Sequence, residues 1–409
     1  MSYFLNLKME IKNKFIKNFI FNVFFYIIII WIISSILFYF YVSQRYGIPP
    51  IYGQIDWERY KDGALSILNF TLPEFPARYY LSYCIYLAIS INIKFPIFSL
   101  ILNLFLNLIS AILIYKISEL LFNKISALIC IILFLFYPFI QMWVFFIQPV
   151  SYFSFSIILL TYAVVTTNKH NQNYLLIFIS SSLTLLARPH GISLIISLFI
   201  FLIIKNKLNH KINLIIYFLL LVFLAIYINY LGNGNIIPIF ESWRMEDLKQ
   251  FGYNLPIIND QSLKICLNLS DTELNNFSRE NSPSTSLSFW ACSFFNNPID
   301  VFKIFIYRIF VSLSFYKPVF SFAHNMFSAM TLIPIYLFFL FSLIKFYNQK
   351  INFILISILL ILFSSCVTIV DGDNRVFSAV LPIIFIISSG GIGFFLERYF
   401  GYLILNKFR

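Results

Sequence analysis

Charged residues are scarce in this sequence. They make up 11% of the 409 residues, whereas a typical soluble domain has roughly 25%. Hydrophobic residues make up 60%, which is more apolar surface than the core of a soluble domain can bury. The composition therefore excludes a soluble globular protein and indicates that lipid surrounds much of the chain.

CxxC motifs and a continuous basic face are also lacking. The five cysteines include no CxxC pair, which excludes the usual zinc and thioredoxin-like motifs. Cys266 and Cys292 share one loop and could form a disulfide if that loop is extracytoplasmic. The net charge is +12, but the Lys and Arg residues lie between apolar runs, so nucleic acid is not an expected partner.

Long apolar runs fill most of the sequence. Runs of about 18 to 24 residues recur between residues 19 and 396, and each is long enough as a helix to cross roughly 30 Å of hydrocarbon. The first run, 19–42, is too long for the apolar part of a signal peptide. We therefore expect it to remain attached as a first transmembrane helix.

Basic residues between the runs predict the topology. Lys8, Lys12, Lys14 and Lys17 precede the first run and place the N-terminus in the cytoplasm by the positive-inside rule. If the short, Tyr-rich stretch 79–93 lies along the outer interface, the cytoplasmic segments hold 15 of the 29 Lys and Arg residues but only 3 of the 17 Asp and Glu residues. This asymmetry favours an interfacial stretch 79–93 and a multi-pass cell-membrane protein with both termini in the cytoplasm.

The predicted fold is an all-α, polytopic transmembrane helix bundle of about ten spans, with interfacial helices in the first outer loop. We expect spans near residues 19–42, 96–115, 125–147, 150–167, 174–187, 190–204, 212–231, 326–344, 351–369 and 378–396. Three regions result: a membrane module at 1–231 with its first outer loop at 43–95, a long extracytoplasmic loop at 232–325 with an interfacial helix near 303–315, and C-terminal spans with a cytoplasmic tail at 326–409.

The first outer loop carries acidic residues. The pattern of 56–64 predicts an amphipathic helix on the membrane surface, with Asp56 and Tyr60 on one face and Arg59 in the same segment. Glu74 precedes a proline-punctuated turn and an aromatic belt. The alternative is an ordinary interfacial helix whose charges pair with one another.

Isolated basic residues mark the outer ends of later spans. Arg188 and His190 interrupt an apolar stretch, where a charge is costly unless it is paired or reaches the interface, so Arg188 is a functional candidate. An arginine that caps a short hairpin is the alternative. Arg375 follows the acidic stretch 371–373, which lacks the remaining ligands of a calcium loop and could instead form a salt-bridged turn. Lys317 in the long loop could contact an anionic headgroup.

Together these residues suggest sugar transfer from a lipid carrier. Arginines can hold a lipid phosphate by bidentate, charge-assisted hydrogen bonds. A carboxylate can take the proton of an attacking hydroxyl.

On these residues the chain resembles the GT-C superfamily of membrane glycosyltransferases, especially the protein O-mannosyltransferases and the aminoarabinose transferase of lipid A. The family has an acidic residue followed by Tyr and Ala, then an acidic residue before prolines and paired aromatics. The matching residues are Asp56, Tyr60 and Ala64, then Glu74, Pro76, Tyr79 and Tyr80, the helix from Asn103 to Tyr115 with Leu121 and Phe122, the Tyr137-Pro138 bend, the turn 188–191, and the run from Arg375 to Pro382.

The resemblance implies a GT-C-like catalytic module in residues 1–231. It also implies an inverting hexosyl- or pentosyltransferase that moves a sugar from a polyprenyl-phosphate donor to a lipid, glycan or protein acceptor at the outer face, among membrane lipids. Asp56 would act as the catalytic base, and the donor phosphate would be bound by Arg188, Arg375 and Lys317. Glu74, Arg59, Tyr60 and His190 would bind substrate.

One departure from the family concerns metal binding. Many relatives have an acidic residue in the second outer loop, where this chain has Gln148-Pro149. The sequence therefore indicates no metal ligands and leaves the question of a divalent metal cofactor open.

Two other functions fit the same pattern. An O-antigen or polysaccharide polymerase also combines many spans with a long outer loop. A lipid or polysaccharide flippase or transporter would place charges inside broken helices near the bilayer midplane, whereas the spans here are nearly free of charge.

Overall fold

The chain forms an all-α assembly, as the sequence predicts. A computed structural model describes residues 22–41, 43–44, 56–74, 77–94, 97–167, 174–204, 219–220, 222–223, 226, 294–296, 298–313, 321–367 and 375–407. Its elements are an N-terminal helix Asn22–Tyr41, α2 Asp56–Leu68, η1 Ala77–Tyr80, α3 Leu81–Lys94, α4 Ile97–Leu121, α5 Lys124–Phe136, α6 Pro138–Met142, η2 Trp143–Phe145, α7 Val150–Thr166, α8 Tyr174–Ala187, α9 Gly191–Ile204, α16 Pro298–Ser312, α17 Phe322–Phe346, α18 Gln349–Val367 and α19 Arg375–Lys407. No strand occurs in these ranges.

Several of these helices are suited to a bilayer. Within the described residues, four are long and apolar enough to cross a membrane: Asn22–Tyr41, Phe98–Leu121, Phe322–Phe346 and Arg375–Tyr399. A fifth results if the pair Lys124–Phe136 and Pro138–Phe145, which bends by 53°, counts as one span. Shorter apolar helices accompany them at Val150–Thr166, Tyr174–Ala187, Gly191–Leu202 and Gln349–Ser365. The transmembrane bundle is thus supported, while the number of about ten spans stays a prediction, and the span expected at 212–231 lies largely outside the described residues.

Helix α19 forms the centre of the bundle. It contacts α4, α5, α7, α17 and α18, and 78% of its apolar window is buried, compared with 11–39% for the other three long helices. Small residues permit this close packing. Ser389 shares a hydrogen bond of 3.0 Å with Ser118 of α4, and Ser388 donates to the carbonyl of Ile335 of α17 at 2.9 Å.

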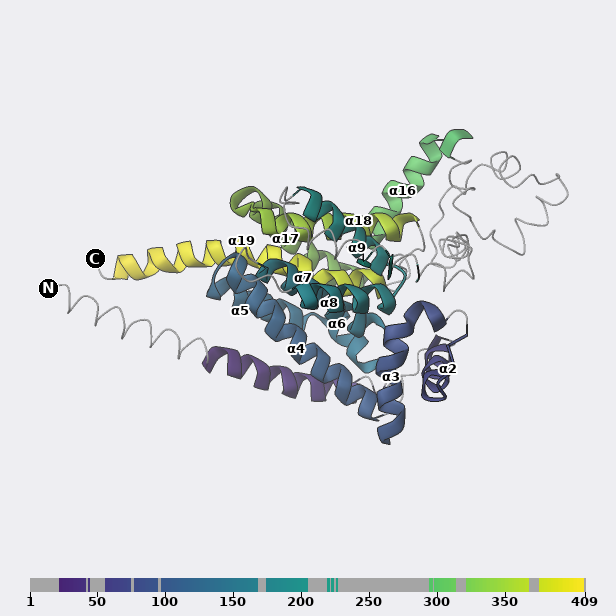
Figure 1. The fold of residues 1–409 in the computed structure, drawn as a ribbon. Helices are drawn as coiled ribbons and strands as arrows, with labels where there is room; N and C mark the ends of the chain where they lie inside the picture. The colour runs from purple at the N-terminus through teal and green to yellow at the C-terminus, as the bar shows by residue number, and fades with distance from the viewer. Residues whose placement is uncertain are drawn as a thin grey trace.

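The two ends of the bundle differ. In Figure 1 the start of the N-terminal helix (purple) and the end of α19 (yellow) lie at one end, while α2 and α3 lie at the opposite end. Helix α3 runs across that end instead of alongside the long helices, although it contacts α4 and α8. An interfacial helix at 79–93 requires such an arrangement.

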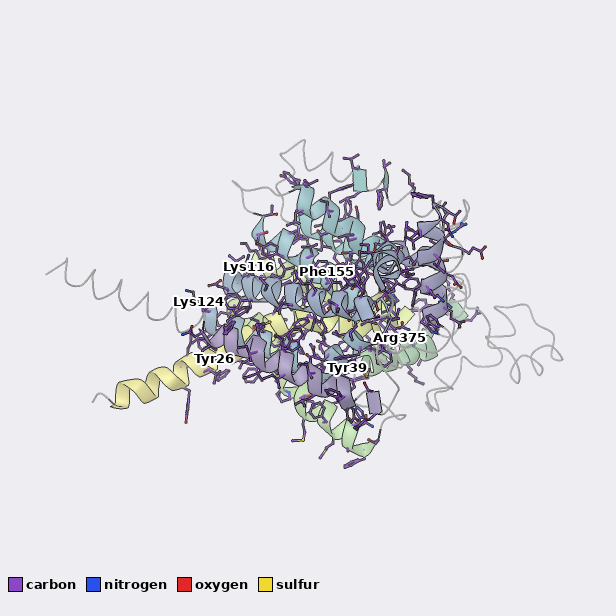
Figure 2. The ribbon with its side chains drawn as sticks, turned by 90° about the horizontal axis from the view of Figure 1, so that it is seen from below. Tyr26, Tyr39, Lys116, Lys124, Phe155 and Arg375 are labelled. Carbon is purple, nitrogen blue, oxygen red and sulfur yellow. The ribbon has the colours of Figure 1, made fainter. Side chains whose placement is uncertain are left out.

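The labelled side chains in Figure 2 also distinguish the two ends of the bundle. Lys116 and Lys124 lie at the end marked by Tyr26 of the N-terminal helix, whereas Arg375 lies at the end marked by Tyr39. The two lysines belong to the junction of α4 and α5 that the charge count assigns to the cytoplasm. Arg375 therefore lies at the opposite end of the bundle from these basic residues.

A helix also forms where the second interfacial helix is expected. Helix α16 begins at Pro298, five residues before the predicted start, and ends at Ser312. It packs against α18 through Phe305 and Phe363, whose ring centroids are 5.5 Å apart. The hydroxyl of Tyr336 on α17 donates to the carbonyl of Leu313 at 2.9 Å, which ties the end of α16 to the bundle.

Candidate functional site

A proline bend between α5 and α6 organises the interior of the site. Pro138 has no N–H, so the carbonyl of Phe134, four residues earlier, loses its helical donor. The side-chain amide of Gln141 replaces that donor, because its Nε2 lies 3.0 Å from the Phe134 carbonyl. A freed carbonyl inside a membrane needs such a partner.

Gln141 also connects two other helices. Its Oε1 accepts hydrogen bonds from Trp31 Nε1 of the N-terminal helix and from Asn107 Nδ2 of α4, each at 3.0 Å. Gln141 is buried, so all three bonds form in a low dielectric, where an unpaired partner would be costly. The bend is therefore fixed to the N-terminal helix, α4 and α5 at one residue.

A second asparagine of α4 holds the next part of the bend. Asn103 lies one turn from Asn107 and so on the same face of α4. Its Nδ2 donates to the carbonyls of Val144 at 3.1 Å and Phe146 at 3.4 Å, and its Oδ1 accepts from the Tyr86 hydroxyl at 2.8 Å. Helix α4 thus fixes the segment on both sides of Trp143.

Trp143 connects the bend to Arg375. Its side chain is 5% exposed, and the guanidinium carbon of Arg375 lies 5.9 Å from its ring centroid, within the range of a cation–π interaction. Arg375 is the first residue of α19. The backbone carbonyl of Arg375 accepts a hydrogen bond of 3.0 Å from Arg188 Nη1. Arg188 therefore bonds to the backbone of the residue whose guanidinium lies over Trp143, although the two arginines are 187 positions apart.

The turn that carries Arg188 is tight. The Gly191 N–H donates to the Arg188 carbonyl at 2.8 Å, and the Ser193 N–H donates to the His190 carbonyl at 3.1 Å. A side chain at position 191 would collide with the backbone carbonyl of Thr184, so only glycine allows α9 to return directly along α8. Within the described part of the chain, Arg188 has no carboxylate partner.

His190 lies buried in this turn. Burial, and then the positive charge of Arg188, lower the pKa of His190 to about 3. The imidazole therefore stays neutral at physiological pH and adds no charge to the arginine pair.

We expect the low pKa of His190 to make the fold sensitive to acid. The unfolded chain takes up a proton near pH 6.5 while the folded chain does not, so the free energy of unfolding should fall by about 2 kcal/mol between pH 7 and pH 5. Thermal unfolding in detergent at both pH values measures this loss, and His190→Gln should reduce it. An equal pH dependence in both proteins would contradict the assignment.

The first outer loop is attached to the bundle by tyrosines. Tyr60 of α2 is buried, and its ring makes edge contacts with Tyr80 and Tyr83, with centroids 5.0 and 5.3 Å apart. On the same face of α2, Ala64 is fully buried. Asp56, the first residue of α2, is therefore carried by a helix that is fixed against η1 and α3.

The same loop approaches the turn with Arg188. Tyr79 of η1 packs with Leu185 of α8 and Ile195 of α9, the two helices that this turn joins. Glu74, just before η1, is exposed, and its carbonyl accepts from the Arg78 N–H at 3.3 Å. The loop with the acidic candidates and the turn with Arg188 thus belong to one packed region.

The structure therefore brings together some of the predicted site residues. Arg188 and Arg375 are in contact, and His190 lies in the same turn as Arg188. Tyr60 and the half-buried Arg59 lie on α2, where the Tyr60 ring is used in packing. Lys317 lies outside the described residues, as do Cys266 and Cys292.

Several residues of this region were missed by sequence reasoning. Trp31, Asn107, Gln141 and Trp143 are all neutral and lie in apolar stretches. One sequence signal that could have revealed them is Gln141, which lies three residues after Pro138 of the Tyr-Pro bend. The other signal is the four-residue spacing of Asn103 and Asn107, which places two side-chain amides on one face of a helix.

Among the residues described, no group of three or more His, Cys, Asp or Glu side chains is arranged to hold a metal ion. The polar side chains around Trp143 carry amide and hydroxyl groups and the guanidinium of Arg375. Such groups can bind anions and hydroxyls by hydrogen bonding.

One of three comparisons with known proteins finds a match. No curated protein and no solved structure matches the chain significantly. The family model described as dolichyl-phosphate-mannose-protein mannosyltransferase matches residues 81–231, a segment that contains α3 to α9, the bend at Pro138 and the turn with Arg188. The match confirms, over that segment, the predicted resemblance to the mannosyltransferase branch of the GT-C membrane glycosyltransferases.

Proposed function

We propose that the protein transfers a sugar, with inversion, from a polyprenyl-phosphate donor to a lipid, glycan or protein acceptor at the outer membrane face. The observation that carries this proposal is the contact between Arg188 and Arg375, with a hydrogen bond of 3.0 Å. It supports a cationic site at the end of the bundle where α2 and α3 lie, suited to a lipid phosphate.

In the proposed reaction, a hydroxyl oxygen of the acceptor attacks the anomeric carbon of the donor sugar. The bond from that carbon to the phosphate oxygen breaks, and polyprenyl phosphate leaves. Asp56 takes the proton of the acceptor hydroxyl as general base. Arg188 and Arg375, together with Lys317, stabilise the charge that develops on the leaving phosphate.

The remaining predicted residues have supporting roles in this proposal. Glu74 and Arg59 contact the sugar or the acceptor from the first outer loop. Tyr60 fixes α2, and His190, neutral in its turn, contacts substrate next to Arg188. Incubation of purified protein with labelled polyprenyl-phosphate sugars and membrane lipid tests the reaction directly. Movement of the carrier across the bilayer without sugar transfer would instead favour a flippase.

Substitution of the arginine pair should weaken donor binding. Arg188→Ala or Arg375→Ala should raise the donor Kd by about tenfold or more, and the lysine variants should show a smaller loss, because lysine keeps the charge but lacks the planar fork. Equilibrium binding of a labelled donor to protein in nanodiscs measures the effect, together with thermal unfolding without donor.

Arg398 provides the control. It is exposed near the far end of α19, so Arg398→Ala should leave donor affinity unchanged. A large loss of stability without donor, with unchanged donor affinity in the Arg188 and Arg375 variants, would show that these arginines have an architectural role only.

A further inference from the structure

A small polar cavity lies between α4, the bend at α6 and η2, α7 and α19. Its polar lining consists of Asn107, Ser110, Trp143, Ser151, Ser154 and Ser378. The space is about as large as one water or hydroxyl oxygen needs. Ser378 lies one turn after Arg375 on α19, and Ser151 and Ser154 lie in the first turns of α7, so the cavity is close to the arginine pair.

Two donors in this lining lack partners. Trp143 Nε1 and Ser154 Oγ form no hydrogen bond with any described residue, and their side chains are only 5% and 6% exposed. Buried polar groups are usually paired, so each unpaired group needs an explanation. An indole N–H only donates, while a serine hydroxyl both donates and accepts. One oxygen atom between them could therefore satisfy both.

The lining also restricts the kind of ligand. It contains amide, hydroxyl and indole groups but no charged side chain, so it suits a neutral hydroxyl better than an ion. Trp143 belongs both to this cavity and to the arginine site, because the guanidinium of Arg375 lies over its ring.

We propose that this cavity is a subsite for one hydroxyl group of the donor sugar. That hydroxyl accepts a hydrogen bond from Trp143 Nε1 and forms a second one with Ser154 Oγ, while Arg188 and Arg375 hold the adjoining phosphate. The inference rests on the proposed function. It gives the protein a way to bind the sugar-bearing donor more tightly than polyprenyl phosphate, the product, which has no such hydroxyl.

The experiment compares two probes on the full chain in nanodiscs. One is the polyprenyl-phosphate sugar that the wild-type protein binds most tightly among a panel of hexoses and pentoses, and the other is bare polyprenyl phosphate. Trp143→Phe, which keeps an aromatic face for Arg375, and Ser154→Ala should each weaken binding of the sugar-bearing probe by about threefold to tenfold. Binding of the bare phosphate should stay within about twofold.

Two control variants distinguish failure of the proposed hydroxyl subsite from failure of the proposed phosphate site. Ser357 of α18 is also buried and unpartnered among the described residues but does not line the cavity, so Ser357→Ala should change neither affinity. Arg188→Ala should weaken both probes, and its failure to weaken either would refute the phosphate site itself. If Arg188→Ala weakens both probes while Trp143→Phe and Ser154→Ala weaken neither, or weaken both equally, the subsite is overturned.

Discussion

Replacement of Asp56 by asparagine should lower the rate of sugar transfer by about 10²- to 10⁴-fold, the usual effect of losing a general base at the reacting centre. Asparagine has nearly the same shape but cannot take the proton of the acceptor hydroxyl. It is also as favourable as aspartate at the start of a helix, so α2 should still form. Initial rates with a labelled polyprenyl-phosphate sugar measure the loss of activity. Expression level and thermal unfolding show whether the variant still folds.

Asp62 provides the matched control for this experiment. It lies on the same helix and its side chain is exposed, so Asp62→Asn should keep the rate within about twofold of wild type, as is usual for a surface site. If Asp56→Asn retains activity within a few-fold, or if both variants lose activity equally, Asp56 is not the base. The carboxylate would then belong to an ordinary interfacial helix.

Replacement of Gln141 by leucine should strongly destabilise the bundle. The change leaves the Phe134 carbonyl, the Trp31 indole N–H and the Asn107 amide without the partners that Gln141 provides. A buried group left unpaired costs about 1–3 kcal/mol, although hydrogen bonds in membrane proteins are often worth less, about 0.6 kcal/mol on average. We expect a total loss on the order of 3 kcal/mol, measured by unfolding in mixed detergent.

Gln148 offers a matched comparison in the same segment. It is also buried, but its Oε1 has no hydrogen-bond partner among the described residues, so Gln148→Leu should be nearly neutral. If Gln141→Leu cannot be purified, Trp31→Phe removes one bond of the three and should give a smaller, measurable loss. Equal stability of the Gln141 and Gln148 variants would show that the hydrogen bonds at the bend do not hold the bundle together.

The helices were predictable because the apolar runs are long and the loops between them are polar. The amphipathic pattern of 56–64 gave a helix, α2, that the structure extends to Leu68. Predicted boundaries were less accurate where charged or polar residues end a span. Helix α19 begins at Arg375 and ends at Lys407, beyond both limits of the predicted span 378–396, because a helix can continue into the interface where long charged side chains reach water.

The candidate site was predictable only in part. Arg188 and Arg375 could each be recognised as a charge beside an apolar run, but their contact depends on where the bundle places the turn after α8 relative to the start of α19, which no local pattern encodes. The role of Gln141 was hidden for a similar reason, since a single glutamine in an apolar stretch has no periodicity. Its partner could have been found by counting four residues back from Pro138 to the carbonyl that the proline leaves free.

The central position of α19 has a consequence for the biosynthesis of this protein. The ribosome makes α4, α5 and α7 before α19, yet these helices pack against it. The faces of these helices that contact α19 in the folded protein, including Ser118 of α4, are exposed to lipid or to the insertion machinery until α19 is inserted. Arg375 enters with that helix and meets Arg188 only then. The contact between Arg188 and Arg375 therefore forms only when α19 packs into the bundle, so a partly inserted chain lacks the arginine pair on which the proposed donor site depends.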